Sequence, residues 1–300
     1  MFDPAQLAAL SAVLRTGSFD RAAQLLHVTQ SAVSQRLRQL EEQVGTSLVV
    51  RSQPCRATEA GERLFRHAEE VRLLEQGVRR DLGLTSTGVE ESGGWPSLRI
   101  AVNADSLATW FLPAMAEVGG VLFDLVIDDQ DHSADWLKRG EVRAAVSGSA
   151  KPVQGCDCRP LGALRYLATA SPDFILRWFG DEPVTAGRLA QVPVITFNAK
   201  DRLQTRWAEQ TLGVPTTGPS HWLPSSHAFV DAAVAGLGWG MNPEKLAEAA
   251  LADGRLQELV AGKPLDVPLY WHVSRSVVDA LRPLTDAVIK AARDALRPLG

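Results

Sequence analysis

The sequence is short of several features that would assign it to other classes of protein. Only three of its 300 residues are cysteines (Cys55, Cys156 and Cys158), too few for a disulfide framework, which fits a reducing compartment. Its apolar runs fall far short of the ~18 residues that span a bilayer. The N-terminus lacks the basic and apolar regions of a secretory signal. We therefore expect a cytoplasmic protein with no membrane partner.

Signatures of common enzyme classes are also missing. No Gly-x-Ser-x-Gly elbow and no phosphate-binding glycine loop occur. Cys156-x-Cys158 has no partner at zinc spacing, because the nearest histidines, His132 and His221, form no metal pattern. The glycine-rich stretch 236–240 follows a helix-like run, so we interpret it as a turn that leads into a strand. The sequence predicts no catalytic residue, no metal, no cofactor and no enzyme activity.

The charge that is present is unevenly divided. The whole chain has 31 basic and 35 acidic residues, a net charge of −4. Through Arg80 there are 11 arginines, no lysine and 9 acidic residues, so this part carries +2 and the remainder −6. A slightly basic head on an acidic body is typical of a DNA-binding domain joined to another module. The length predicts two or three domains.

Two consecutive helices are predicted near the N-terminus. Ser18 is a suitable N-cap for the first, in which Ala22 and Ala23 would let another helix cross closely. The second runs from about Gln30 to Val44 and ends at Gly45. At about 100° per residue, its apolar side chains fall on one face, which predicts that this face joins the core. Those apolar residues are Val33, Leu37 and Leu40.

The opposite face of the second helix is suited to DNA. It is polar, its side chains are short near the N-terminus, and it has no carboxylate before Glu41. Gln can pair with an adenine edge, Ser with either base type and Arg with guanine or phosphate. An ordinary amphipathic surface helix would show the same spacing. The candidate DNA-binding residues of this segment are Thr29, Gln30, Ser31, Ser34, Gln35 and Arg38.

A hairpin is predicted after this helix. The β-like run 48–51 leads into the turn-rich stretch 52–56, and Thr58 caps a new helix. Arg51 and Arg56 place two guanidinium groups on the hairpin, suited to phosphate or minor-groove contacts. Both could equally be solvated surface residues. Together these elements predict a winged helix-turn-helix.

The helix after Thr58 extends to about Leu82, which is long for a globular protein. It precedes a Ser/Thr/Gly-rich hinge at 84–96 and has no obvious partner in its own chain, so we predict a dimerisation helix. Packing on the C-terminal domain is the alternative. In a dimer, two recognition helices would read half-sites about 34–36 Å apart. The predicted dimerisation residues are Leu64, Ala68, Val71, Leu74, Val78 and Leu82.

Beyond the hinge, short β-rich runs alternate with helical segments. This alternation predicts an α/β domain with mainly parallel strands. The predicted strands are 98–102, 122–127, 142–147, 164–170, 192–197 and 269–274.

The N-terminal motifs resemble those of LysR-type transcriptional regulators. The resemblance rests on Ser18-Phe19, the run Thr29-Gln30-Ser31-Ala32-Val33-Ser34, and Thr58-Glu59-Ala60-Gly61. Segments 101–110, 139–142, 161–167 and 269–272 are similar to the ArgP/LysG (IciA) branch of that family. Members of this branch sense lysine or arginine and control the export of basic amino acids. The resemblance covers nearly the full length.

The resemblance implies an α/β fold class in three parts. Residues 1–58 would form the winged helix-turn-helix, 59–96 the linker or dimerisation helix and hinge, and 97–300 a two-lobed, periplasmic-binding-protein-like effector domain. Lobe I would comprise 97–163 and 270–300, and lobe II 164–268, with crossing strands near 164–170 and 269–274. The implied partners are double-stranded operator DNA, further copies of the chain (a dimer, or a tetramer built as a dimer of dimers) and RNA polymerase. The implied effector is L-lysine or L-arginine.

The residues themselves suggest where such an effector would bind. The segment from Asn103 through Ala104 and Asp105 to Ser106 joins a strand to a helix and offers backbone N–H groups and a hydroxyl to a carboxylate. A basic ligand also needs carboxylates, and Asp105, Asp128 and Asp129 stand at strand ends. Turn and cap chemistry explains all of these positions equally well. Weaker candidates are Ser147, Phe197, Asn198, Ser225 and Ser226.

A second function remains open from the sequence. An architectural or replication-associated DNA-binding protein of the same fold would share the N-terminal motifs without amino-acid control. Such a protein would not need an α/β module of ~200 residues. The module therefore favours a ligand-responsive regulator.

Overall fold

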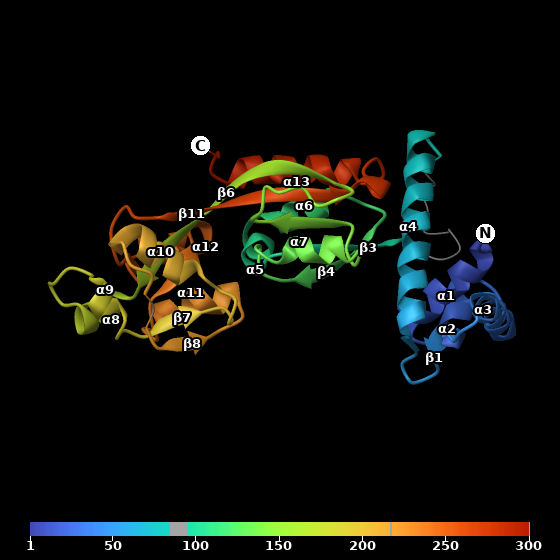
Figure 1. Cartoon of the computed structure of the whole chain (residues 1–300), viewed down its shortest axis with the longest axis horizontal. Helices are drawn as coiled ribbons and strands as arrows, with labels where there is room; N and C mark the ends of the chain where they lie inside the picture. Colours follow the sequence, from blue (N-terminus) through green and yellow to red (C-terminus); the bar gives the residue numbers. More distant parts are fainter. Residues whose placement is uncertain (85–94, 217, 300) are drawn as a thin grey trace. The chain divides into compact units, whose positions relative to one another are not determined.

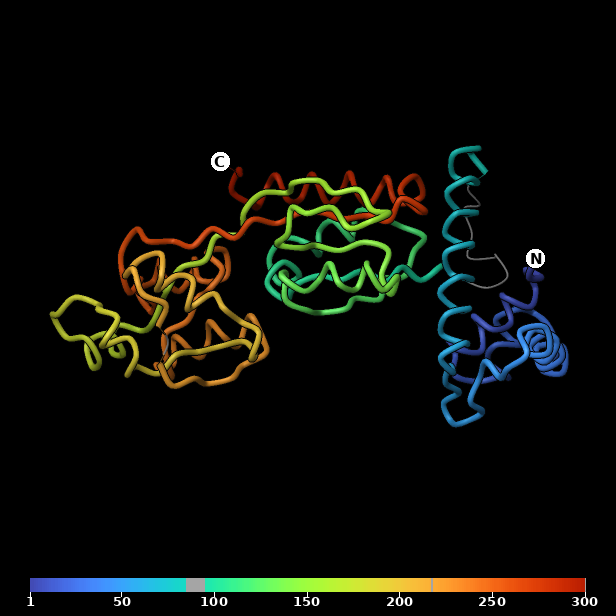
Figure 2. The backbone as a smooth tube through the Cα atoms, viewed as in Figure 1, coloured from blue at the N-terminus to red at the C-terminus, as the bar shows by residue number. Residues whose placement is uncertain are grey.

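A computed structural model describes residues 1–84, 95–216 and 218–299. The chain forms two compact units (Figures 1 and 2). Unit 1 comprises Met1–Arg99, Gly119–Asp124 and Ser276–Pro283, and unit 2 comprises Ile100–Val118, Leu125–Arg275 and Leu284–Gly300. The predicted hinge at 84–96 lies largely outside the described residues. Among the described residues, no helix combines the length and apolar character needed to cross a membrane.

Unit 1 begins with three short helices, a two-stranded hairpin and one long helix. Their bounds are α1 Pro4–Thr16, α2 Phe19–Leu25, α3 Gln30–Val44, β1 Val49–Val50, β2 Arg56–Ala57 and α4 Glu59–Asp81. Side chains of Ser18, Thr29 and Thr58 accept hydrogen bonds from the first turns of α2, α3 and α4. Such caps satisfy backbone N–H groups that have no partner within the helix. The predicted bounds of α3 are confirmed, with Gly45 in the left-handed conformation that ends it.

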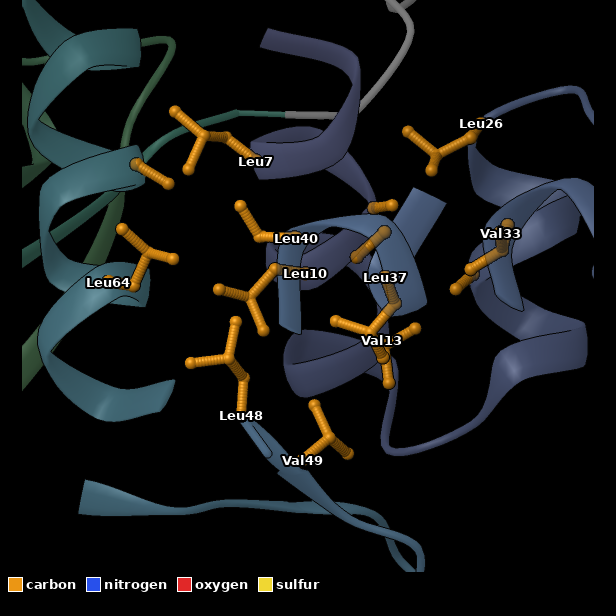
Figure 3. Close-up of a cluster of buried hydrophobic side chains, with 14 of the residues drawn as sticks. Leu7, Leu10, Val13, Leu26, Val33, Leu37, Leu40, Leu48, Val49 and Leu64 are labelled. Carbon is orange, nitrogen blue, oxygen red and sulfur yellow. The ribbon is translucent and has the colours of Figure 1, made fainter. Parts of the chain in front are cut away.

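The core of unit 1 lies where α1, α3, the hairpin and the start of α4 meet. Figure 3 shows the apolar side chains of these elements directed toward one another. The predicted inward face of α3 is confirmed, because Val33, Leu37 and Leu40 are fully buried. At Gly61, a Cβ would lie 1.9 Å from the carbonyl oxygen of Leu48, so only glycine lets α4 approach the hairpin this closely.

Helix α4 contacts different partners along its length. Its first half buries Leu64 and Ala68 in the core of unit 1. On the opposite side of the helix, Leu73 and Gly77 are buried, and a Cβ on Gly77 would lie 3.2 Å from the Cβ of Ala280. The expectation that α4 has no partner in its own chain is therefore wrong. The spacing placed these apolar residues on one face but could not show that Leu64 and Ala68 are covered by their own chain.

Unit 2, together with the parts of β3 and β4 that begin in unit 1, holds an α/β fold. Its strands are β3 Ser97–Val102, β4 Leu122–Ile127, β5 Ala144–Ser147, β6 Cys156–Ala170, β7 Val194–Thr196, β8 Ser220–Trp222, β9 Gly240–Pro243, β10 Gln257–Glu258 and β11 Leu265–Ser274. Its helices are α5 Ala104–Ser106, the π-helical η1 Leu107–Phe111, α6 Leu112–Ala116, α7 Ser133–Lys138, α8 Pro172–Trp178, α9 Ala186–Leu189, α10 Leu203–Leu212, α11 Ser226–Val234, α12 Glu244–Ala252 and α13 Arg282–Ala295, with the 3₁₀ turn η2 Arg275–Val277.

The main sheet has the order β10-β6-β11-β5-β3-β4, and β9 pairs with β6. Strands β6 and β11 are antiparallel over their length, from Tyr166 opposite Leu265 to Cys156 opposite Ser274. The prediction of mainly parallel strands is wrong for this sheet, although β3 with β5 and β7 with β8 are parallel. The alternation of strands and helices along the chain does not fix the relative direction of paired strands. Strands β6 and β11 connect two sets of elements in opposite directions, so they pair antiparallel.

Figure 1 shows this role of β6 and β11 within unit 2. The two strands run from the part that contains α5, α7 and β4 to the part that contains α10, α11 and β7. They coincide with the two predicted crossing strands, and the chain passes between the parts along both of them. Stretch 236–240 leads into β9, as predicted. The limits of the predicted domains and lobes stay predictions.

Candidate functional site

The outer face of α3 is open to a macromolecule. Gln30, Ser31, Gln35 and Arg38 are exposed and Ser34 is partly exposed, while the apolar face of the same helix is buried. The Thr29 hydroxyl accepts a hydrogen bond from the Ala32 N–H (3.2 Å) and lies 2.9 Å from the Ser31 hydroxyl. Because the first turn of a helix presents N–H groups, this end can also receive a phosphate.

The hairpin is held against α3 and carries two exposed arginines. Glu41 accepts a hydrogen bond from the Leu48 N–H at 2.8 Å, which ties the end of α3 to the start of the hairpin. Val50 pairs with Arg56, and the Arg51 guanidinium lies 5.1 Å from the Phe19 ring centroid. Within the described residues, neither Arg51 nor Arg56 forms an ion pair. Their charges therefore remain available to an anion.

The structure brings all the predicted DNA-binding positions to the surface of unit 1. It assembles a recognition helix and a wing from local elements, as the sequence indicated. That these side chains contact DNA stays a prediction.

Unit 2 contains one pocket that gathers many of the predicted effector residues. Its cavity volume is about 90 Å³. Its lining comes from the β3–α5 junction, the end of β4, the loop after β7, and α11 with β9. The lining residues are Asn103, Ala104, Asp105, Ile127, Asp128, Asp129, Gln130, Phe197, Asn198, Asp201, Leu203, Phe229, Met241 and Pro243.

Asp105 is the most deeply buried carboxyl of the pocket. Its Oδ2 accepts a 2.8 Å hydrogen bond from the hydroxyl of Tyr166, on strand β6. Burial raises the pKa of Asp105, and the negative charge of Asp201 adds to this, while the Tyr166 bond acts in the opposite direction. The Ser226 hydroxyl is buried near this carboxyl and also lowers its pKa, but its geometry falls short of a hydrogen bond. A cationic group would stabilise the ionised form of Asp105.

Asp128 is already surrounded by donors. Its Oδ2 accepts from the Trp136 Nε1–H and its Oδ1 from the Lys200 ammonium, both at 2.9 Å. Partial burial acts to raise the pKa of Asp128, but these two bonds and the Asp129 N–H outweigh it and lower the pKa. Burial raises the pKa of the neighbouring Asp129, as do the charges of Asp131 and Asp201.

The buried amide oxygen of Asn103 indicates that the pocket binds a polar ligand. Asn103 is buried, and its Oδ1 has no hydrogen-bond partner among the described residues. Buried polar groups without partners are uncommon in native proteins, and a ligand can supply the partner. Asn103 stands at the N-terminus of α5, where the sequence predicted a carboxylate to bind.

Several predicted effector residues lie outside the lining. Ser147 is buried and its hydroxyl donates to the Gln130 carbonyl oxygen at 3.2 Å, which shapes the wall from behind. Ser225 caps α11, and Ser106 and Ser226 are buried. The sequence reasoning missed Asp201, Gln130, Leu203, Phe229, Met241, Pro243 and Ile127 as lining residues. The position of Asp201 just after a predicted strand is the one signal that could have found it.

These two sites together define a class of protein. A winged helix with an exposed polar face is suited to DNA, and a polar pocket in a separate α/β unit is suited to a small ligand. Comparison with known families agrees: residues 4–62 match the bacterial regulatory helix-turn-helix proteins of the lysR family, and residues 93–297 match the LysR substrate binding domain. The chain belongs to the LysR family and is a ligand-responsive, DNA-binding transcriptional regulator. The predicted fold class is confirmed.

Within the LysR family, the chain is similar to regulators named LysG and ArgP. The chain is 46% identical to the HTH-type transcriptional regulator LysG of Mycobacterium tuberculosis, covering 98% of this chain and 95% of the relative. It is 45% identical to the regulator ArgP of Pseudomonas aeruginosa, covering 99% and 98%. These relatives are transcriptional regulators, not enzymes. The predicted resemblance to this branch is confirmed.

Solved structures agree with the sequence relatives. The crystal structure of ArgP from Mycobacterium tuberculosis is 44% identical, with a TM-score of 0.75 and full coverage of both chains. Full-length LysG from Corynebacterium glutamicum with bound effector Arg is 39% identical, with a TM-score of 0.62 and coverage of 99% of this chain and 100% of that one.

Proposed function

We propose that this regulator senses L-lysine or L-arginine in the pocket of unit 2 and controls a gene for export of basic amino acids. The single observation that carries the proposal is the convergence of Asp105, Asp128, Asp129 and Asp201 on one pocket. Carboxylates of this density need a cation, and basic amino acids carry one on the side chain as well as the α-ammonium.

The remaining parts of the pocket suit the rest of an amino acid. The backbone N–H groups at the start of α5 can bind the α-carboxylate, and the Asn103 amide oxygen, which has no partner among the described residues, can accept from the α-ammonium. Phe197, Phe229 and Met241 offer apolar surface to an aliphatic stem. The relative LysG with bound effector Arg supports the same ligand class.

A thermal-shift comparison of matched amino acids tests the ligand. Norleucine is lysine without its side-chain ammonium, and citrulline is arginine with a neutral side chain. We expect lysine or arginine to stabilise the full-length protein by about 2.7 kcal/mol at 100 times its Kd, and the neutral analogues to do so much less. Equal stabilisation by the neutral analogues contradicts the cation-based proposal. Absence of any amino-acid effect favours the architectural function instead.

The controlled gene is tested in cells. Fragments bound by the protein are mapped genome-wide with and without added lysine or arginine. We expect a bound site upstream of a gene for a membrane exporter. Either the occupancy of that site or the expression of that gene should change with the amino acid. A site set that is indifferent to both amino acids contradicts the proposal. RNA polymerase is then the partner through which the change in transcription occurs.

A dimer is part of the proposal, on a smaller surface than the sequence indicated. Leu64 and Ala68 are buried in their own chain, which removes them from the dimer surface. Leu74, Val78 and Leu82 continue the same face of α4 with exposures of 39%, 58% and 67%, and Val71 is partly exposed. Exposed apolar residues in a row on one helix face are typical of a helix–helix interface.

Sedimentation of full-length variants tests this surface. Val78→Asp is expected to lower the mass by half or more, because a charge in an apolar seam is left unpaired. Leu176→Asp, at an apolar residue of unit 2 that is also mostly exposed (68% against 58% for Val78), serves as the control. Wild-type mass in the Val78→Asp variant contradicts the assignment. The same measurement on the wild type separates a dimer from the predicted dimer of dimers.

A further inference from the structure

Lys200 joins two separate parts of the pocket wall. Asp128 follows strand β4, whereas Lys200 lies in the loop after β7, and the Lys200 Nζ is 2.9 Å from the Asp128 Oδ1. The lysine side chain is 51% exposed and the Asp128 side chain 16%. Asp128 lines the pocket, so one of its oxygens is occupied by a cation from the protein itself.

The loop that carries Lys200 is held by its own hydrogen bonds. The Lys200 N–H donates to Asn198 Oδ1 at 2.8 Å. Asp201 Oδ2 accepts from the Phe197 N–H at 2.9 Å and from Gln204 Nε2 at 3.0 Å, and Gln204 also donates to the Ile195 carbonyl oxygen. The backbone therefore presents Lys200 from a fixed position, and only its flexible stem needs to move when the ion pair breaks.

The other partners of Asp128 come from its own neighbourhood in the chain. The Asp129 N–H donates to Oδ1 at 2.9 Å, and the Trp136 indole of α7 donates to Oδ2 at 2.9 Å. These two bonds hold the carboxylate in place from behind. Among the described residues, Lys200 is the partner that a ligand can replace without disturbing the β4–α7 segment.

We propose that Lys200 is a tethered competitor, which neutralises Asp128 in the ligand-free protein and is displaced when a cationic group of the bound amino acid takes its place. The proposal rests on the proposed function. It assigns Lys200 a role in specificity, because a neutral ligand that displaced Lys200 would leave the Asp128 carboxylate without a cationic partner. It also links ligand binding to the release of a contact between two parts of unit 2.

The expected cost of displacing Lys200 is small. Ion pairs with this degree of exposure are weak, because solvent screens them and the lysine stem loses rotamer freedom. Removing the competitor should lower the Kd for lysine or arginine roughly two- to fivefold, equivalent to about 0.4–1 kcal/mol at 1.4 kcal/mol per factor of ten.

Calorimetric titration of full-length variants tests the proposal. Lys200→Met removes the charge and keeps the apolar stem, while Lys200→Arg keeps the charge. Lys290→Met is the matched control, since Lys290 pairs with Glu117 at 2.8 Å on the surface of unit 2, outside the pocket lining. We expect a lower Kd for Lys200→Met, an unchanged or higher Kd for Lys200→Arg, and no change for Lys290→Met.

The outcomes separate this inference from the proposed function. If the wild type binds lysine or arginine and Lys200→Met binds them equally or more weakly, Lys200 is not a competitor. The same conclusion follows if Lys290→Met gains as much, because the effect would then come from net charge alone. If the wild type binds neither amino acid, the proposed function itself has failed.

Discussion

The outer face of α3 and the adjacent hairpin carry exposed cationic and neutral polar side chains, whereas the pocket of unit 2 gathers partly buried carboxylates. Arg51 and Arg56 have no ion-pair partner within the described residues, so their charges face solvent. Asp105 and Asp128 are each held by donors from the protein. The first surface is suited to a large polyanion and the second to a small cation.

The difference shows how charged groups are stabilised on an exposed surface and in a partly buried pocket. Exposed guanidinium groups remain hydrated and need no partner within their own chain. A buried carboxylate is costly unless it is paired, and Tyr166 and Lys200 are the partners that Asp105 and Asp128 find within the chain. With Lys200 as a competitor, a cationic ligand in the pocket exchanges one partner of Asp128, whereas an anion at the hairpin displaces no ion pair of Arg51 or Arg56 within the described residues.

The largest expected effect is a loss of stability confined to unit 1, which would separate DNA binding from amino-acid binding. Gly61→Ala places a Cβ 1.9 Å from the Leu48 carbonyl oxygen and should destabilise unit 1 by about 3 kcal/mol. DNA binding is expected to be lost while amino-acid binding remains, as measured by gel shift and calorimetry. Gly187→Ala is the control, because a Cβ there meets nothing within 4 Å. Parallel loss of both activities in Gly61→Ala would show that the two regions are not separable.

The second effect sharpens the description of the DNA surface. Gln35→Ala removes a side chain suited to base edges and should relax preference at one operator position by about 1–3 kcal/mol. Arg51→Ala should weaken binding to all sequences alike and reduce the salt slope by about one. Competition assays with operator variants and random DNA measure both. If both variants lose equal affinity for specific and random DNA, Gln35 does not contribute to sequence preference and its role does not differ from that of Arg51.

The smallest effect concerns the pocket and its pH dependence. Burial raises the pKa of Asp105 above its ordinary value of 3.8, so the folded chain takes up a proton at a higher pH than the unfolded chain. The free energy of unfolding therefore falls as pH rises from the unfolded pKa through the folded one. Asp105→Asn should flatten this fall, because the amide does not titrate.

Urea unfolding of the ligand-free protein at a series of pH values measures the change. Asp128→Asn is the control of opposite sign, since the pKa of Asp128 is lowered and its contribution is lost as pH falls. If Asp105→Asn retains the wild-type slope, Asp105 is not the group responsible. The raised pKa of Asp129 gives the same sign as that of Asp105 and would then explain the slope.

Much of unit 1 follows from the sequence because its determinants are local. The cap at Thr29, the apolar spacing of Val33, Leu37 and Leu40, and the stop at Gly45 specify α3 within a few turns of chain. Gly61 belongs to a motif that the sequence shows. Only the fold explains why glycine is needed there, because a side chain would clash with the Leu48 carbonyl oxygen.

Helix α4 shows the limit of local reasoning. Its apolar residues at 64, 68, 71, 74, 78 and 82 recur at steps of three and four, and the sequence therefore assigned them one role. The core of unit 1 covers Leu64 and Ala68 and ends before Leu74. Periodicity specifies a face of a helix, but the length of that face that is buried depends on elements elsewhere in the chain.

For the pocket, the sequence by itself determined Asn103, Ala104, Asp105, Asp128 and Asp129, because a strand that ends before a polar turn marks a binding edge. Only the tertiary structure brought Asp201, Gln130 and Met241 to the same cavity and placed Tyr166 and Lys200 on its carboxylates. The reason is physical. Strands β6 and β11 cross between two parts of unit 2, and residues separated by more than a hundred positions meet only after both strands have paired.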